Sequence, residues 1–222
     1  MIAAAAPPGV GPAFWSLVTA DRLAGADVVD VGTGSGRVAL ALAPGCRHVV
    51  GVDRDTGALE EGRRRARDAR LTNLEFVEAD VEARADYLRL GSVVDRPTRV
   101  VAHLCMSEAI IAATSRSLAA GDRLIFAALH ADQWRETGRR SRFAYDTDEA
   151  RRQLEAHGFT VEHLDVEREV QTFDSVEQGL AAAIGLAERW KTDGRWFRYI
   201  KFLEDGGRTL TRSHLVAQAR RR

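Results

Sequence analysis

The stretch that most constrains the fold is residues 26–44, ADVVDVGTGSGRVALALAP. The β-branched run at 28–31 predicts a short buried strand, and the Ala/Leu/Val segment that stops at Pro44 predicts a helix. Between them lie the glycines of residues 32–36. A glycine backbone can be touched by a ligand because no Cβ blocks the approach, and a helix start offers unpaired N–H groups. The stretch therefore predicts a strand, a tight turn and a helix that border a ligand site.

Length, charge and cysteine usage set the broad class. The chain has 222 residues, enough for one sizeable core, and its 32 basic residues balance 32 acidic ones. A nucleic-acid binder usually shows a basic excess, so this class is disfavoured. Cys46 and Cys105 lack metal-type spacing, so we expect no disulfide and no metal site, and a reducing cytoplasm. No apolar run approaches a membrane span, and we expect no signal peptide.

Strands alternate with helices along residues 26–130. We expect further strands at 47–53, 74–78, 99–106 and 123–129, helices at 56–70 and 108–118, and a helix or loop at 81–90. This alternation predicts an α/β fold, a doubly wound parallel sheet with helices on both faces. Ligands of such sheets bind at the carboxyl ends of the strands. The glycine stretch, Asp53, Asp80 and the segment after His103 all fall at such ends, which predicts that they converge.

The flanking segments complete one domain. Residues 13–23 predict a helix that closes the edge of the core, with a lid over a ligand as the alternative role. Further helices are expected at 148–157, 175–190 and 195–203, and strands at 159–170 and 209–219. We find no internal repeat and no linker, so a single domain over residues 1–222 is the simplest interpretation.

The motifs resemble those of class I S-adenosylmethionine-dependent methyltransferases over nearly the whole chain. The family's first motif, an acidic and a hydrophobic residue before Gly-x-Gly-x-Gly, matches residues 30–36. Its acidic residues after the second and third strands match Asp53 and Asp80. LAAGDRL at 118–124 is similar to the family's L-x-x-G-G-x-L, with Asp122 in place of the second glycine. HGF at 157–159 and HLVAQA near the end match its C-terminal half.

This resemblance implies a Rossmann-like sheet of seven strands, mostly parallel, with an antiparallel last strand beside the fifth. It divides the single domain into an N-terminal arm and helix (1–25), a cofactor-binding half (26–130) and an acceptor-side half (131–222). Aromatic residues of the flanking parts would line the acceptor pocket, although core packing explains Trp190 and Trp196 at least as well.

The resemblance also implies S-adenosyl-L-methionine as cofactor and S-adenosyl-L-homocysteine as product. The glycine backbone would pack against the amino acid end and the ribose, and Asp30 would order the turn and attract the ammonium. Asp53 would accept hydrogen bonds from the ribose hydroxyls, and Asp80 from the adenine amine. Capping of the next helix is an ordinary role for both, compatible with this one. The implied cofactor-binding residues are Asp30, Gly32, Thr33, Gly34, Ser35, Gly36, Asp53, Arg54, Asp80 and Val81.

The expected reaction is methyl transfer to an unidentified acceptor, on O, N or C, mainly by proximity and orientation. Neutral charge favours a small molecule, and nucleic acid is not the expected partner. Asn/Asp-Pro-Pro-Tyr, which marks amino-group methylation of bases and glutamine, is absent: residues 103–107 read HLCMS. The sequence does not identify a catalytic base. His103 is the candidate because imidazole titrates near neutrality, and packing at a strand end is its ordinary alternative. We expect Cys105 to be a small buried residue.

Two alternatives stay open. An intact glycine motif without an evident base also fits a regulatory or partner protein that binds the cofactor without turnover. NAD(P)-dependent enzymes use a glycine turn too, but their pattern is G-x-G-x-x-G, whereas Arg37 follows G-x-G-x-G here. Asp80 and the late antiparallel strand favour the methyltransferase.

Overall fold

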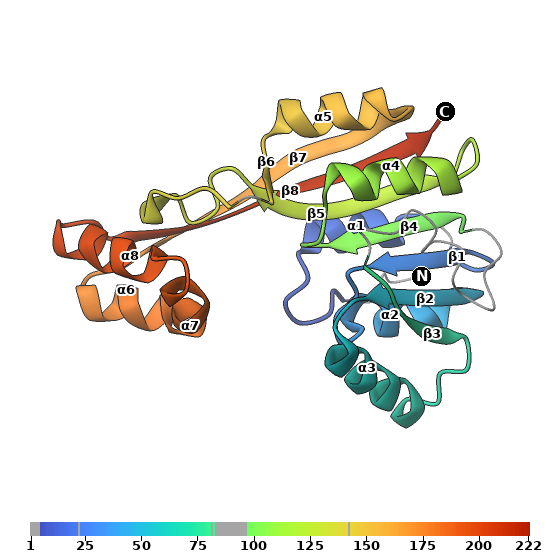
Figure 1. The fold of residues 1–222 in the computed structure, drawn as a ribbon, viewed down its shortest axis with the longest axis horizontal. Coiled ribbons are helices and arrows are strands. Elements are labelled where there is room, and N and C mark those ends of the chain that lie inside the picture. Colours follow the sequence, from blue (N-terminus) through green and yellow to red (C-terminus); the bar gives the residue numbers. More distant parts are fainter. Residues whose placement is uncertain (1–4, 22, 81, 83–96, 142) are drawn as a thin grey trace. The chain divides into compact units, whose positions relative to one another are not determined.

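The computed structural model describes residues 5–21, 23–80, 82, 97–141 and 143–222 (Figure 1). Its sheet has eight strands in the order β3-β2-β1-β4-β5-β8-β7, and β6 pairs with β5 outside this path. The strands are β1 (Asp27–Val31), β2 (His48–Asp53), β3 (Leu74–Glu78), β4 (Arg99–His103), β5 (Arg123–His130), β6 (Ala144–Tyr145), β7 (Phe159–Thr172) and β8 (Thr209–Arg221).

Helices connect most of these strands. They are α1 (Pro12–Thr19), α2 (Arg37–Leu42), α3 (Thr56–Asp68), α4 (Glu108–Ser117), α5 (Thr147–Ala156), α6 (Val176–Ala183), α7 (Ala187–Lys191) and α8 (Arg195–Glu204). Local sequence explains several starts. The Asp55 carboxylate accepts a hydrogen bond from the Ala58 N–H at 3.0 Å and caps α3. Ser107 caps α4 in the same way, through the Ile110 N–H.

The first five long strands form the predicted parallel sheet. β1 pairs in parallel with β2 and β4, β2 with β3, and β4 with β5. The register places Val31 opposite both Val52 and Ala102, so the carboxyl ends of three neighbouring strands meet at one edge. All five residues of β1 are buried, as expected for a parallel strand covered on both faces.

The last strand lies beside the fifth, as predicted. The Gly121 N–H donates to the Arg221 carbonyl at 2.9 Å and the Arg221 N–H to the Asp122 carbonyl at 2.8 Å. These bonds join the start of β5 to the end of β8, so the two strands are antiparallel. The two-residue strand β6 was not predicted, because such a short segment carries no periodicity.

One face of the sheet packs against α1 and α2. Phe14 and Trp15 of α1 and Leu42 of α2 share a buried cluster with alternate residues of the strands, among them Val28 and Val101. This confirms the expected core role of the first helix, which begins at Pro12 and ends at Thr19 rather than running over 13–23.

Two other predicted elements end differently in the structure, and one predicted segment cannot be compared. The strand expected at 99–106 ends at His103, because Leu104 adopts a left-handed φ of +60° that an extended strand cannot hold. The helix expected at 175–190 is interrupted: α6 ends at Ala183, a 3₁₀ turn covers Ile184–Leu186, and α7 follows. The segment 81–90 lies outside the described residues, apart from Glu82.

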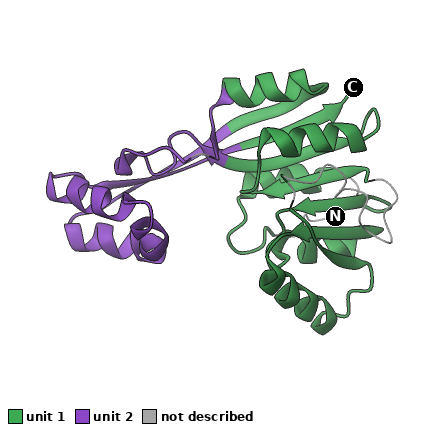
Figure 2. Cartoon of the chain, in the orientation of Figure 1, with its two compact units in different colours: residues 1–128, 148–165, 216–222 green, residues 129–147, 166–215 purple. Residues whose placement is uncertain are grey.

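The chain divides into two compact units (Figure 2). Unit 1 contains residues 1–128, 148–165 and 216–222, and unit 2 contains 129–147 and 166–215. In unit 2, Trp190 and Tyr199 are fully buried, with ring centroids 5.6 Å apart in an edge-to-face contact. They and the neighbouring Trp134 form the core of this unit, together with the partly buried Trp196. Core packing is thus the observed role of these aromatic residues.

Candidate cofactor site at the glycine turn

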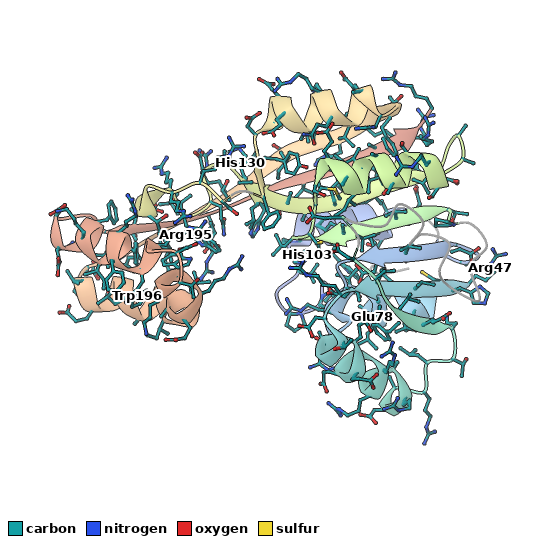
Figure 3. The ribbon with its side chains drawn as sticks, in the orientation of Figure 1. Arg47, Glu78, His103, His130, Arg195 and Trp196 are labelled. Carbon is teal, nitrogen blue, oxygen red and sulfur yellow. The ribbon has the colours of Figure 1, made fainter. Side chains whose placement is uncertain are left out.

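A cavity of about 240 Å³ lies in unit 1 at the carboxyl ends of β1 and β4. Its wall combines the glycine turn, the start of α2 and the segment after β4. Figure 3 labels His103 at this edge and Arg47 at the opposite edge of the sheet. The lining residues are Asp30, Gly32, Thr33, Gly34, Ser35, Arg37, Val38, His103 and Leu104.

Backbone hydrogen bonds hold the turn against the end of β2. The N–H groups of Gly32 and Thr33 both donate to the Val52 carbonyl, at 2.8 and 3.0 Å. The Gly36 N–H donates to the Thr33 carbonyl at 3.0 Å and closes the turn before α2 begins. These hydrogen bonds hold the turn against the end of β2.

Two glycines of the turn differ in the space that surrounds them: a side chain at Gly36 would clash, and one at Gly34 would not. Gly36 has a φ of +80°, and a Cβ there would lie 2.5 Å from the Phe76 ring, so this position needs glycine for packing. Gly34 has a φ of +55°, and a Cβ there would meet no atom within 4 Å. Open space beside the Gly34 backbone is what a ligand that touches the main chain requires.

The Asp53 side chain reaches the turn from the end of β2. Its Oδ2 accepts a hydrogen bond from the Gly34 N–H at 2.7 Å, and its Oδ1 accepts one from the Asp55 N–H at 3.0 Å. A carboxylate offers about four acceptor sites, so lone pairs remain for further donors. The structure thus brings Asp53 to the glycine turn, although the carboxylate is not among the cavity-lining groups.

Asp30 is the buried acid of the cavity wall. It is 2% exposed, and its Oδ2 accepts hydrogen bonds from the Thr33 hydroxyl at 2.6 Å and the Ala39 N–H at 3.2 Å. These bonds join the end of β1 to the turn and to α2, the ordering role that the resemblance implied. Burial raises the pKa of Asp30 to about 7, because desolvation outweighs the two hydrogen bonds.

Besides Gly36 and Asp53, three more sequence-predicted residues are not part of the cavity wall or lie outside the described residues. Asp80 follows β3, and its Oδ1 accepts a hydrogen bond from the Glu82 N–H at 3.0 Å. Arg54 is exposed, and neither residue lines the cavity. Val81 lies outside the described residues. The Ala79 N–H does donate to the Asp53 carbonyl at 2.9 Å, so the chain before Asp80 runs next to the end of β2.

The segment after β4 forms the other wall. The His103 ring lies 5.2 Å from the Phe14 ring, tilted by 49°. Leu104 is 42% exposed with a left-handed φ, and its N–H donates to the Ala127 carbonyl at 2.7 Å. Such a conformation is strained for leucine and recurs at functional sites. Burial raises the pKa of the Cys105 thiol to about 11, so the neutral thiol is a poor nucleophile, in line with the expected packing role.

Sequence reasoning missed three lining residues: Arg37, Val38 and Leu104. Arg37 carried a usable signal, because it directly follows the last glycine and opens α2. The exposure of Leu104 depends on its left-handed backbone conformation, which no sequence pattern predicts.

Metal-ligand clusters and membrane-spanning helices are both absent from the described ranges. In that part of the chain, no group of three or more His, Cys, Asp or Glu side chains is arranged to hold a metal ion. No helix within those ranges is long and apolar enough to cross a membrane.

Comparisons with known proteins point to one family. Residues 28–121 match the family model described as a methyltransferase domain. Among curated proteins, no sequence matches the chain significantly.

Solved structures share the fold at low identity. A protein from Bacillus halodurans with a provisional methyltransferase name has a TM-score of 0.68 at 20% identity, over 95% of this chain and 99% of that one. An S-adenosylmethionine-dependent methyltransferase from Mesorhizobium loti has a TM-score of 0.58 at 19% identity, over 95% and 99%. The magnesium protoporphyrin IX methyltransferase from Synechocystis, solved with bound S-adenosylhomocysteine, has a TM-score of 0.61 at 15% identity, over 95% and 80%. Residues 28–121 therefore match the model of a methyltransferase domain, and the chain has the fold of class I S-adenosylmethionine-dependent methyltransferases.

Proposed function

We propose that this chain transfers a methyl group from S-adenosylmethionine to a small-molecule acceptor, on O, N or C. The observation that carries the proposal is the hydrogen bond from the Gly34 N–H to the Asp53 carboxylate, at the edge of an open cavity. The match of residues 28–121 to a methyltransferase domain supports it. The bound S-adenosylhomocysteine of the Synechocystis relative supports the cofactor.

The residues present suit an adenosyl amino acid. The open space beside Gly34 leaves the backbone free for contact, and two carboxylates stand at either side of the turn. In our proposal Asp30 attracts the ammonium of the cofactor, and Asp53 accepts hydrogen bonds from its ribose hydroxyls. Asp80 and Val81 bind its adenine. When bound, the cofactor supplies a methyl group activated by its sulfonium.

The chain's own contribution is orientation and the exclusion of water. Parallel pairing and the bonds to Val52 hold the turn in place, so little rearrangement is needed on binding. His103 borders the cavity, and we propose it as the base for an acceptor that must lose a proton. Its packing against Phe14 is an equally simple reason for its position.

The acceptor class and compartment are also proposals. A balanced charge of 32 basic and 32 acidic residues favours a small organic molecule over nucleic acid. Tight, salt-sensitive RNA binding by the purified protein would contradict this. The free thiols of Cys46 and Cys105 support the reducing cytoplasm as the site of action.

A ligand panel tests the reaction class. We expect S-adenosylhomocysteine to raise the melting temperature and NAD(H) to leave it unchanged, since a ligand at about 100 times its Kd stabilises by about 2.7 kcal/mol. Stabilisation by NAD(H) alone would support a dinucleotide enzyme. Labelled methyl transfer to a metabolite pool then tests turnover, and cofactor binding without any transfer would support the regulatory alternative.

A further inference from the structure

Arg37 gives the cavity a positive charge that the proposed function does not use. The residue begins α2, directly after the glycine turn, and its exposed side chain lines the cavity. Among the described residues that form this wall, Arg37 is the one Lys or Arg and Asp30 the one acid. The side chains of Arg37 and Asp30 therefore line the same cavity, and Gly34 and Ser35 line it as well.

The Arg37 guanidinium keeps most of its donors for other groups. Its Nη1 donates to the Gly9 carbonyl at 3.3 Å, a long bond to a neutral acceptor. Within the described ranges it forms no ion pair, whereas Arg64 and Arg123 each contact two acidic side chains. A guanidinium recognises a carboxylate best through two parallel N–H bonds, and a lone carbonyl does not satisfy that geometry.

The Gly9 contact also fixes where the guanidinium lies. Gly9 has a φ of +78°, and a Cβ there would lie 2.5 Å from Nη1 of Arg37. The contact with the Gly9 carbonyl thus places the guanidinium beside the cavity and uses one of its five donors.

We propose that Arg37 binds the α-carboxylate of an amino acid ligand in this cavity, opposite the ammonium site at Asp30. A zwitterionic amino acid end needs an acceptor for its ammonium and a cation for its carboxylate, and Asp30 and Arg37 of this wall provide the two. The inference rests on the proposed function, since the amino acid is then the methionine end of the cofactor. Arg37 makes the site prefer adenosyl ligands with an intact amino acid end over nucleosides that lack it.

Calorimetry on the full chain with two ligands tests this. S-adenosylhomocysteine carries the amino acid end, and 5′-methylthioadenosine is an adenosyl thioether without it. We expect Arg37→Gln to weaken S-adenosylhomocysteine binding about tenfold, as for loss of a charged hydrogen bond, and to leave 5′-methylthioadenosine within about twofold. Arg37→Lys should retain part of the affinity. Arg67→Gln, an exposed arginine of α3, is the matched charge control and should change neither.

Each other outcome is decisive. Equal weakening of both ligands by Arg37→Gln, at an unchanged melting temperature, would mean that Arg37 only shapes the cavity and would overturn the inference. An unchanged affinity for S-adenosylhomocysteine would overturn it as well. Failure of the wild-type chain to bind either ligand would reject the proposed function itself, and the inference with it.

Discussion

The Asp53 carboxylate accepts a 2.7 Å hydrogen bond from the backbone N–H of Gly34. This bond joins the end of β2 to the turn after β1. It exists because Val31 and Val52 are opposite each other in parallel strands, so that both strands end at the same edge. A carboxylate thereby stands beside a backbone that has open space next to it.

Replacing Asp53 by alanine should weaken S-adenosylhomocysteine binding about tenfold to a hundredfold, because a charged acceptor for hydroxyl donors is lost. Loss of the acceptor for the Gly34 N–H should lower stability by about 1 kcal/mol. Calorimetry gives the affinity and urea unfolding the stability.

Asp55→Ala is the matched control in the same loop. It removes the cap of α3, so we expect a loss of about 1 kcal/mol in stability with an unchanged affinity. If both variants weaken binding equally, the effect comes from disorder of the loop, and the assignment of Asp53 fails.

Alanine at Gly34 and at Gly36 should separate binding from folding. Gly34→Ala places a Cβ in open space, so stability should fall by about 1 kcal/mol from its left-handed backbone while ligand affinity falls at least about tenfold. Gly36→Ala drives a Cβ into the Phe76 ring, so stability should fall by about 3 kcal/mol. Thermal melts and calorimetry on the two variants measure both effects. Unchanged affinity in Gly34→Ala would place the ligand elsewhere.

Asp30→Asn should alter how stability depends on pH. The folded-state pKa of Asp30 is raised to about 7 by burial, so the folded chain holds this proton above the pH at which the unfolded chain releases it. The stability that Asp30 contributes therefore falls as pH rises from about 4 to about 7, by about 1.4 kcal/mol per pH unit at most. The asparagine Oδ1 can still accept from Thr33 and Ala39, so the variant keeps both bonds and loses the titration.

Urea unfolding at several pH values measures this difference. We expect the free energy of unfolding of the variant to rise relative to that of the wild type between pH 4 and about pH 7. Above that range the difference between the two should stay constant. The pKa of Asp27 is lowered, chiefly by its hydrogen bond from Arg47, and that contribution is common to both proteins and cancels. A pH-independent difference would show that Asp30 is ionised throughout.

His103→Ala distinguishes a base from a packing residue once labelled-methyl screening provides an acceptor. A base predicts a fall in kcat of about a hundredfold, loss of the acidic limb of the pH profile, and cofactor affinity within about twofold of wild type. His163→Ala, on β7, is the control and should leave kcat unchanged. If kcat and its pH profile persist in His103→Ala, the contact with Phe14 is the role of this histidine.

Much of the fold could be predicted from local sequence patterns. The β-branched run and the glycines before Arg37 correctly predicted β1, the turn and α2. The strand at 74–78 has the predicted bounds, and the last strand pairs beside the fifth. These succeed because periodicity and turn chemistry act over a few residues. The break of the expected helix at Ile184–Leu186 was not predicted, although Gly185 lies within it and glycine has a low helix propensity.

The sequence by itself determined the order of strands and helices, and which polar residues follow each strand. Only the tertiary structure decided that Asp53 turns toward Gly34, that Asp80 and Arg54 stay off the cavity wall, and that Arg37 joins it. Burial, pKa and side-chain direction depend on atoms brought close from distant parts of the chain, and those distances are set by packing rather than by any local pattern.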